Sequence, residues 1–497
     1  MFTVRCPRKR VNSEYRLSSL RYCSRVFAPP SSDVRCVADA VFSWAMVLAI
    51  CTVFCGCASY TAIPIAPPAT MRAFEARTLD SPELQSYVAS HLAAGSVSGK
   101  IRTWDLETLT LAAFYFSPNL DLARAKNATA DAATQTASQR PNPSLQLPFQ
   151  YGTNPKSGDS PYTLGLGLDI PIETAGKRGY RVAQARQLSV AARFDVGNAA
   201  WQVRSQLRAQ LLDLFVARRR GRLLDRQVKA RQQVVEMLDK RLSVGAVSTP
   251  EVQQAGAALM QERLALIKVN GQVFDALAGA AAVIGLPFRE LEKADVRLDA
   301  FATDPPDLPD EAARERALLN RADLLSALAD YEASQAALQL EVANQYPDIH
   351  LGPGYTFDAG VHKFGLSLTG IALPLFNRNE GPIAEAAARR EEAAARFTAA
   401  QAQAIAVAER AAKQYHTALT FRSFSEALRA NRERQLTAVR KSYEAGVCDR
   451  LGLTLAEIDA YSAALAQEDA FAQMQRASGE VEDAMHLPLS ARATSPR

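Results

Sequence analysis

Cysteine is almost absent from most of this 497-residue chain. Cys448 is the single cysteine after position 57. The other six lie at or before position 57: Cys6, Cys23, Cys36, Cys51, Cys55 and Cys57. A lone thiol cannot form an intrachain disulfide, and no cysteine pair beyond position 57 has the spacing of a zinc site. We therefore expect the bulk of the chain to fold without covalent or metal cross-links.

Catalytic and cofactor-binding motifs are also missing. The segment Ala175-Gly176-Lys177 lacks the first glycine of a phosphate-binding loop, because Pro171 occupies that position. The histidines show no HExxH pattern: His91, His350, His362, His416 and His486. We therefore expect no enzyme, no cofactor and no resident metal. His350 and His362 flank predicted strands, where metal capture is the alternative to an ordinary surface position.

The charge distribution gives no sign of a nucleic-acid partner. The chain carries a formal net charge of +5. Residues 1–56 hold eight Lys/Arg against three Asp/Glu, which accounts for the whole excess. The basic character therefore belongs to a segment that an exported protein loses, and the remainder is formally neutral.

An uncharged, apolar run covers residues 40–54. Its length suits the core of a signal peptide and is short for a bilayer span. The run meets Cys55-Gly56-Cys57, and small residues before a cysteine are typical of a bacterial lipoprotein cleavage site. We expect residues 1–56 to be a leader and Cys57 to be lipidated; an uncleaved anchor or a conventional cleavage nearby are the alternatives.

The same unit occurs twice in the chain. Five anchor pairs, 201 to 204 positions apart, keep one register: Leu120 with Leu324, Pro143 with Pro347, Pro171 with Pro374, Gly245 with Gly446, and Pro287 with Pro488. This predicts an extension over 57–106, a first repeat over 107–290, a linker over 291–308, a second repeat over 309–488 and a tail over 489–497.

Each repeat contains one long helical segment and two shorter ones. No proline interrupts residues 173–248 or 383–487, and Leu207, Leu214 and Val228 fall in a heptad pattern typical of a coiled coil. We predict long helices over 178–243 and 382–444. The shorter helices are expected over 107–139, 250–284, 309–345 and 452–485.

Strand signals stand where the helices stop. Residues 164–172 alternate strictly between large apolar and small or polar residues, and residues 364–375 do so with a phase slip at Gly370, where we expect a bulge. Two hairpins are predicted, over 143–172 and 347–376. Four strands cannot close a barrel in lipid, so we expect copies to associate. A small sheet capping a soluble bundle is the alternative.

The strand-to-helix turns carry a family resemblance. Leu373-Pro374-Leu375-Phe376-Asn377-Arg378-Asn379-Glu380-Gly381 and its counterpart, Pro171 to Gly179, resemble the turns of TolC-type outer-membrane efflux proteins, nearest to their heavy-metal (CzcC-like) branch. Trp104-Asp105-Leu106 and Ala322-Asp323-Leu324-Leu325 are similar to the same family. The resemblance covers about residues 104–488. Its turn residues in this chain are Pro171, Gly176, Pro374, Phe376, Asn377 and Gly381.

The resemblance implies a mainly α-helical homotrimer. Each protomer contributes four strands to one outer-membrane β-barrel, and long antiparallel helices to a periplasmic α-barrel. A periplasmic adaptor and an inner-membrane pump are the implied partners, and metal cations the implied cargo. Export of drugs, other organic compounds or polypeptides is the alternative, followed by a lipid-anchored scaffold without a pore.

The helical hairpin ends are the expected docking and gating region. By resemblance, the adaptor-docking residues are Gly245, Val247, Val252, Gly446, Val447 and Leu453. Turn glycines with packing residues and no partner are the alternative. Asp449 and Arg450 are candidates for a charged gate, against ordinary solvated loop charges.

Overall fold

A computed structural model describes residues 58–92, 100–154, 157–305, 308–369 and 372–489. The predicted leader with Cys57, and Gly370, lie outside the described residues. Residues 1–67 and 68–497 form separate units, and residues 58–66 of the first are exposed without helix or strand.

The helices are α2 (Pro67–Glu75), α3 (Pro82–His91), α4 (Leu106–Phe116), α5 (Pro118–Ser138), α6 (Lys177–Ser243), α7 (Thr249–Ile284), α8 (Phe288–Lys293), α9 (Glu311–Leu319), α10 (Ala322–Ala343), α11 (Glu380–Glu444) and α12 (Arg450–Met485). The strands are β1 (Thr103–Trp104), β2 (Ser144–Gln146), β3 (Phe149–Tyr151), β4 (Tyr162–Ile172), β5 (Asp295–Val296), β6 (Ile349–Asp358) and β7 (Val361–Thr369).

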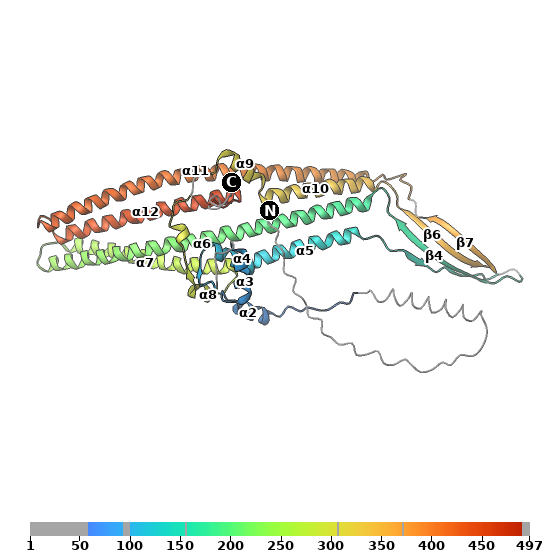
Figure 1. The fold of residues 1–497 in the computed structure, drawn as a ribbon, viewed down its shortest axis with the longest axis horizontal. Coiled ribbons are helices and arrows are strands. Elements are labelled where there is room, and N and C mark those ends of the chain that lie inside the picture. The colour runs from blue at the N-terminus through green and yellow to red at the C-terminus, as the bar shows by residue number, and fades with distance from the viewer. Residues whose placement is uncertain (1–57, 93–99, 155–156, 306–307, 370–371, 490–497) are drawn as a thin grey trace, which may run out of the picture. The chain divides into compact units, whose positions relative to one another are not determined.

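The two repeats fold alike, as the sequence predicts. The long helices α6 and α11 have 67 and 65 residues, so each is about 100 Å long at 1.5 Å per residue. The helices α7 and α12 turn back along them with 36 residues each. In residues 68–497 the sheet lies at one end of the helices and both hairpin tips at the other (Figure 1). The prediction of long antiparallel helices with a small β part is confirmed.

Two of the predicted shorter helices are each divided, so the sequence-based bounds 107–139 and 309–345 are wrong. The first breaks between α4 and α5 at Ser117, which is extended (φ −62°, ψ 121°) because it precedes Pro118. The second breaks between α9 and α10 at Arg321, which is also extended. Arg321 binds Asp323 at 2.7 Å and donates to the carbonyl of Ala484 on α12, so a distant contact holds this break.

The predicted linker over 291–308 is partly ordered structure. It contains the end of α8, the strand β5 and a 3₁₀ turn over Asp299–Phe301. β5 pairs in parallel with β1, placing Val296 opposite Trp104. This small pairing ties the linker to the start of α4.

The main sheet has the order β2-β4-β6-β7, with β3 also paired to β4. All pairings in it are antiparallel. The first predicted strand is divided into β2 and β3 at Pro148, which has no N–H to donate to the ladder. The carbonyl of Pro148 still accepts from the N–H of Gly165 at 2.8 Å, so both pieces keep one register against β4.

The last strand is shorter than the sequence predicts. β7 ends at Thr369, and residues 372–376 form no strand. The predicted extension of the second hairpin to residue 376 is therefore wrong for the single protomer. The equivalent end of β4 runs to Ile172, because Ile170 and Ile172 pair with Leu351 and Ile349 of β6. Within the described chain the end of β7 has no such neighbour.

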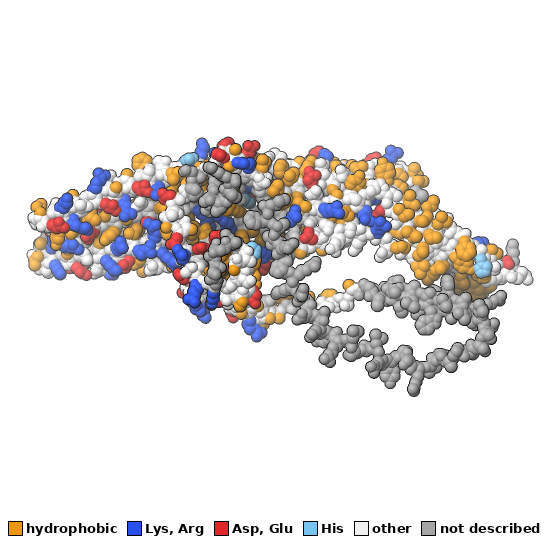
Figure 2. Space-filling view, in the orientation of Figure 1, with side chains coloured by type: hydrophobic (Ala, Val, Ile, Leu, Met, Phe, Trp, Pro, Cys, Tyr) orange, Lys and Arg blue, Asp and Glu red, His pale blue; other side chains and the backbone are white. Residues whose placement is uncertain are grey.

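The two sides of this sheet differ in polarity. One row across it reads Gln146, Gly167, Gly354 and Gly365, so that side carries small and polar residues. The other side carries large apolar residues that are at least 42% exposed: Leu145, Leu164, Leu166, Leu168, Phe364, Leu366 and Leu368. Figure 2 shows apolar side chains gathered over this end of the molecule. A soluble protein rarely exposes so large an apolar patch.

The helices form one layer with open edges. Toward the tips the neighbours run α7, α6, α12, α11; toward the sheet they run α5, α6, α10, α11. α11 therefore forms one edge throughout. The largest core cluster lies near the middle of the helices, where Leu84 of α3, Leu109 of α4, Leu211 of α6 and Ile284 of α7 are fully buried. The helix α3, within the predicted extension, is thus part of the folded core.

Candidate functional site

The first hairpin tip is a tight helix reversal at Gly245. Its φ of +75° lies in the left-handed region, which glycine adopts without strain. The N–H of Ala246 donates to the carbonyl of Arg241 at 2.8 Å, which satisfies the end of α6. Ser248 and Glu251 then form a capping box at the start of α7. Two independent caps therefore fix this tip.

The second tip repeats the reversal at Gly446, with a φ of +74°. The N–H of Val447 donates to the carbonyl of Ser442 at 2.9 Å. Asp449 caps α12 by accepting from the N–H of Gly452 at 2.7 Å. The two tips match in backbone but differ in their caps, since the carboxylate of Asp449 stands where the first tip has the hydroxyl of Ser248.

The predicted docking residues differ in exposure. Val447 is 83% exposed, while Val247 and Val252 are half-buried. Leu453 is only 3% exposed, so its assignment as a surface contact is wrong for this conformation. Leu453 lies in the first turn of α12, on a face of the helix that the rest of the chain covers.

The two tips are joined by an ion pair between Arg241 of α6 and Asp449. The hydrogen bond from Arg241, and then that from the N–H of Gly452, lower the pKa of Asp449 below its usual value. Arg450 makes a longer contact, from its guanidinium to the Oε1 of Gln233 at 3.5 Å. Both proposed gate residues therefore contact α6, and the sequence did not indicate Arg241 as the partner.

At the sheet end, the first strand-to-helix turn surrounds Gly176, whose φ is +73°. Lys177 binds Asp348 at 2.8 Å, and the hydroxyl of Thr174 donates to the carbonyl of Pro347 at 2.7 Å. These contacts join the turn of the first repeat to the two residues just before β6, the first strand of the second repeat. Pro171 lies within β4 opposite His350, just before this turn.

The second turn places its left-handed residue at Asn379, with a φ of +63°. Asn379 donates to the carbonyl of Glu341 at 2.7 Å, and its N–H donates to the Oδ1 of Asn377 at 2.7 Å. Phe376 is fully exposed and Gly381 lies inside α11. Sequence reasoning missed Asn379. The signal was present, because Asn379 follows Pro374 by five residues as Gly176 follows Pro171, and Asn tolerates this conformation.

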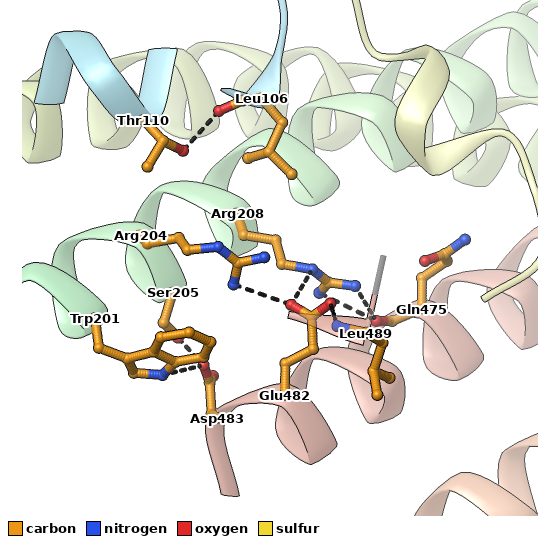
Figure 3. A network of polar contacts seen from close by, with 10 residues as sticks. All are labelled: Leu106, Thr110, Trp201, Arg204, Ser205, Arg208, Gln475, Glu482, Asp483 and Leu489. Atoms are coloured by element: carbon orange, nitrogen blue, oxygen red, sulfur yellow. Dashed lines mark hydrogen bonds and ion pairs between the residues drawn. The ribbon is translucent and has the colours of Figure 1, made fainter. Parts of the chain in front are cut away.

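A buried polar network, not foreseen from the sequence, joins α6 to the end of α12 (Figure 3). Glu482 binds Arg204 at 3.0 Å and Arg208 at 3.5 Å, and accepts from the N–H of Leu489 at 3.0 Å. The guanidinium of Arg208 also donates to the carbonyl of Gln475. Burial lowers the pKa of Arg208, and Glu482 opposes that effect.

Asp483 and His486 extend this network toward α10. Asp483 accepts from the indole N–H of Trp201 at 3.1 Å and from Ser205, while burial raises its pKa. His486 stacks on Trp201 with ring centroids 5.3 Å apart. Burial, and then the nearby Arg321, lower the pKa of His486 to about 4, so its ring is neutral above that pH. The cluster is a structural junction between the repeats.

The described residues place no three His, Cys, Asp or Glu side chains close enough to hold a metal ion. His350 contacts Asp169 at 3.0 Å on the polar side of the sheet, and His362 contacts the hydroxyl of Tyr355 at 2.6 Å. Both His350 and His362 therefore have a partner within the protein.

Comparisons with known proteins bear on this arrangement. The family model described as outer membrane efflux protein matches residues 115–286 and again residues 313–485. The two matches coincide with the two repeats.

Two curated relatives align with part of the chain. The cobalt-zinc-cadmium resistance protein CzcC of Cupriavidus metallidurans is 22% identical over 277 residues, covering 55% of this chain and 64% of that protein. The pyoverdine export outer membrane protein OpmQ of Pseudomonas aeruginosa is 23% identical over 286 residues, covering 52% and 59%. The chain thus aligns with less than two thirds of the length of either relative.

Solved structures share the fold. The outer membrane protein VceC of Vibrio cholerae superposes with a TM-score of 0.63 at 20% identity, covering 77% of this chain and 96% of that one. CusC, whose description refers to transmembrane channel formation, gives 0.63 at 18% identity, covering 76% and 91%. At these identities the likeness establishes architecture only.

Proposed function

The chain belongs to the outer membrane efflux protein family, and on this premise we propose that it is the outer-membrane exit duct of an efflux system. Three copies contribute their sheets to one β-barrel in the outer membrane and their helices to a hollow periplasmic barrel. An inner-membrane pump supplies the energy, and a periplasmic adaptor joins pump and duct. The role is passive transport rather than catalysis.

The observation that carries this proposal is the open sheet with one exposed apolar side. Its edge strands, β2 and β7, have no outer neighbour among the described residues. Lipid does not tolerate open edges, because unpaired backbone N–H and C=O groups have no water to bind there. One chain has too few strands to close a barrel, so copies must share one.

Exposed apolar side chains on the edge helices support the same association. They follow a spacing of three, four or seven residues, which keeps them on one helix face. On α7 they are Met260, Leu264, Ile267 and Phe274, and on α11 they are Phe421, Phe424 and Leu428, all at least 45% exposed. Since α7 and α11 are opposite edges of the helical layer, a second copy placed beside the first covers both stripes.

The hairpin tips are the proposed adaptor-docking surface. Gly245, Val247, Val252, Gly446 and Val447 form its apolar part, and the exposure of Val447 supports this assignment. Leu453 packs beneath this surface instead of belonging to it. The tips lie far from the sheet, which suits a contact made deep in the periplasm (Figure 1).

We assign the gate to the tips as well. The pair of Arg241 with Asp449 holds the two hairpins of one protomer together. Arg450 adds a second polar link to α6. Opening the duct at this end requires the hairpins to move apart, so these contacts favour the closed form.

Metal cations are the proposed cargo, by likeness to CzcC. The runner-up is a small organic compound, because OpmQ is named for the export of pyoverdine and aligns over a similar length.

Lipidation of Cys57 is a further part of the proposal, based on the cleavage-site pattern, and it anchors the protein in the outer membrane.

Purified full-length protein in detergent tests the duct itself. We expect a trimer by native mass measurement, a gel band that shifts on heating, and ion conductance across a planar lipid bilayer. A stable monomer that conducts no ions overturns the duct and favours a scaffold without a pore.

Deletion of the coding region tests the cargo. We expect lower tolerance to zinc, cobalt or cadmium ions, restored by the wild-type chain. Unchanged metal tolerance together with altered tolerance to organic compounds would instead support the second cargo class.

A further inference from the structure

A cavity of about 820 Å³ lies beside the turn from β4 into α6. Arg140, which follows α5, and Arg178, in the first turn of α6, both line it. Ile170 and Ile172 of β4 form part of its wall. The cavity therefore combines two cationic groups with apolar surface, at the point where the sheet meets the helices (Figure 1).

The two arginines have no acidic partner in the part of the chain that the structure describes. Neither guanidinium takes part in an ion pair or a hydrogen bond with a described residue. Among the described residues of the lining the one carboxylate is that of Glu173, and it binds Arg181 at 2.6 Å. Two like charges on one cavity repel each other, and an anion bound in the cavity would offset that repulsion.

Arg181 fixes the segment that carries Arg140. Its guanidinium donates to the carbonyls of Ala137 at 3.0 Å and Gln139 at 3.2 Å, at the end of α5. The same guanidinium binds Glu173, which follows β4. The chain just before Arg140 is thus held against α6, and the cavity is already formed in the single protomer.

The second repeat shows that the fold does not require the two arginines. The positions equivalent to Arg140 and Arg178, 204 and 203 residues further on, are Asn344 and Gly381. The second strand-to-helix turn forms with neither arginine, and α11 begins there as α6 begins after the first turn. A need of the turn itself therefore does not explain why the first repeat carries this pair.

The height of the apolar side of the sheet places the cavity at a membrane boundary. From Tyr162 to Ile172, β4 has 11 residues, which span about 33 Å along the strand. At the usual tilt of membrane strands this is roughly 25 Å of height, the thickness of an outward apolar band. At the far end, the ring of Tyr162 lies 5.4 Å from that of Tyr151 and 6.2 Å from that of Phe149. Such aromatic groups are typical of a membrane interface, so the cavity lies at the opposite, periplasmic interface.

We propose that the cavity binds the anionic headgroup of a phospholipid from the inner leaflet of the outer membrane. This inference rests on the proposed duct, which sets the sheet in lipid, and adds a specific lipid contact to it. The phosphate accepts hydrogen bonds from the guanidinium groups of Arg140 and Arg178. The acyl chains lie along the apolar side of the sheet, which Ile172 joins to the cavity: it is 45% exposed and lines both.

Native mass measurement of the full chain, purified in detergent and stripped of lipid, tests the site. Phosphatidylglycerol is the probe. Phosphatidylethanolamine serves as a lipid without net charge, and inorganic phosphate as an anion without acyl chains. We expect one phosphatidylglycerol to bind to each protomer of the trimer, about tenfold more tightly than phosphatidylethanolamine. An excess of inorganic phosphate should not displace it.

Substitution of both arginines tests their part in binding. We expect Arg140→Gln with Arg178→Gln to bind phosphatidylglycerol about 30-fold more weakly, the effect of two cations at an anionic lipid surface. Arg140→Lys with Arg178→Lys keeps both charges and should retain most of the affinity. Arg193→Gln is the matched control, because Arg193 is exposed on α6 about 22 Å beyond Arg178. It should leave lipid binding unchanged.

Every other outcome overturns the lipid site. Equal binding of the two lipids shows that the anionic headgroup is not recognised, and displacement by inorganic phosphate shows that phosphate alone is recognised. Unchanged binding in the double glutamine variant places the lipid elsewhere. Loss of the trimer in that variant assigns the arginines to a contact between copies.

The same preparation separates this inference from the duct. Any of these results with a wild type that is trimeric and conducts ions removes the lipid site and leaves the duct intact. A monomeric, non-conducting wild type overturns both.

Discussion

At the scale of single residues, the buried carboxylate of Glu482 faces two arginines. Its side chain is 6% exposed, and those of Arg204 and Arg208 are 15% and 11% exposed. Removing one member of a buried ion pair costs more than the pair contributes, because the remaining charge stays without compensation. We expect Glu482→Gln to lower the free energy of unfolding by about 3 kcal/mol, measured by denaturation of the purified protein in detergent.

The matched control is Glu480→Gln, two residues earlier in α12, where the side chain is exposed. A surface charge contributes little, so this variant should unfold within about 0.5 kcal/mol of the wild type. Equal effects of the two substitutions would show that the network contributes no more than a solvated charge.

At the scale of elements, the end of α7 depends on Gly285. Its φ is +84°, and a Cβ added there would lie 2.6 Å from the carbonyl oxygen of Phe116 at the end of α4. Arg77 donates to the carbonyls of both residues, so three segments meet at this point. We expect Gly285→Ala to cost about 3 kcal/mol, from backbone strain of 1–2 kcal/mol and the collision, measured by thermal unfolding.

Gly245→Ala separates the two contributions. Its φ is similar, at +75°, but an added Cβ would meet no atom within 4 Å. This variant should lose only the strain, about 1 kcal/mol. If Gly285→Ala is no more destabilising than Gly245→Ala, the close approach of α4 to α7 does not matter for stability.

The elements also show what the sequence can predict. The tips follow from Gly245 and Gly446, because a glycine at the same place in both repeats permits the left-handed backbone of a tight reversal. The break before α5 follows from Pro118, although it was not predicted. The break at Arg321 depends on its contact with Ala484, and the link between Trp201 and Asp483 spans 282 positions. Such contacts arise only after folding and leave no local signal.

At the scale of the whole molecule, the ion pair of Arg241 with Asp449 would be present three times in the proposed duct. An exposed pair contributes roughly 0.5 kcal/mol, so three copies favour the closed form by about 1.5 kcal/mol, or about tenfold. Asp449→Asn removes the charge and keeps a good helix cap. We expect it to raise conductance in planar bilayers at 0.1 M salt.

Salt and a neighbouring carboxylate provide the controls for this gate. Screening at 1 M salt should bring the wild type toward the variant, because the pair is exposed. Asp459→Asn also removes an acidic side chain from α12, but Asp459 contacts Arg432 of its own hairpin at 3.5 Å and does not join the two hairpins. It should therefore leave conductance unchanged. If Asp459→Asn opens the duct as much as Asp449→Asn does, loss of negative charge near the tip explains the effect and the proposed gate contact does not.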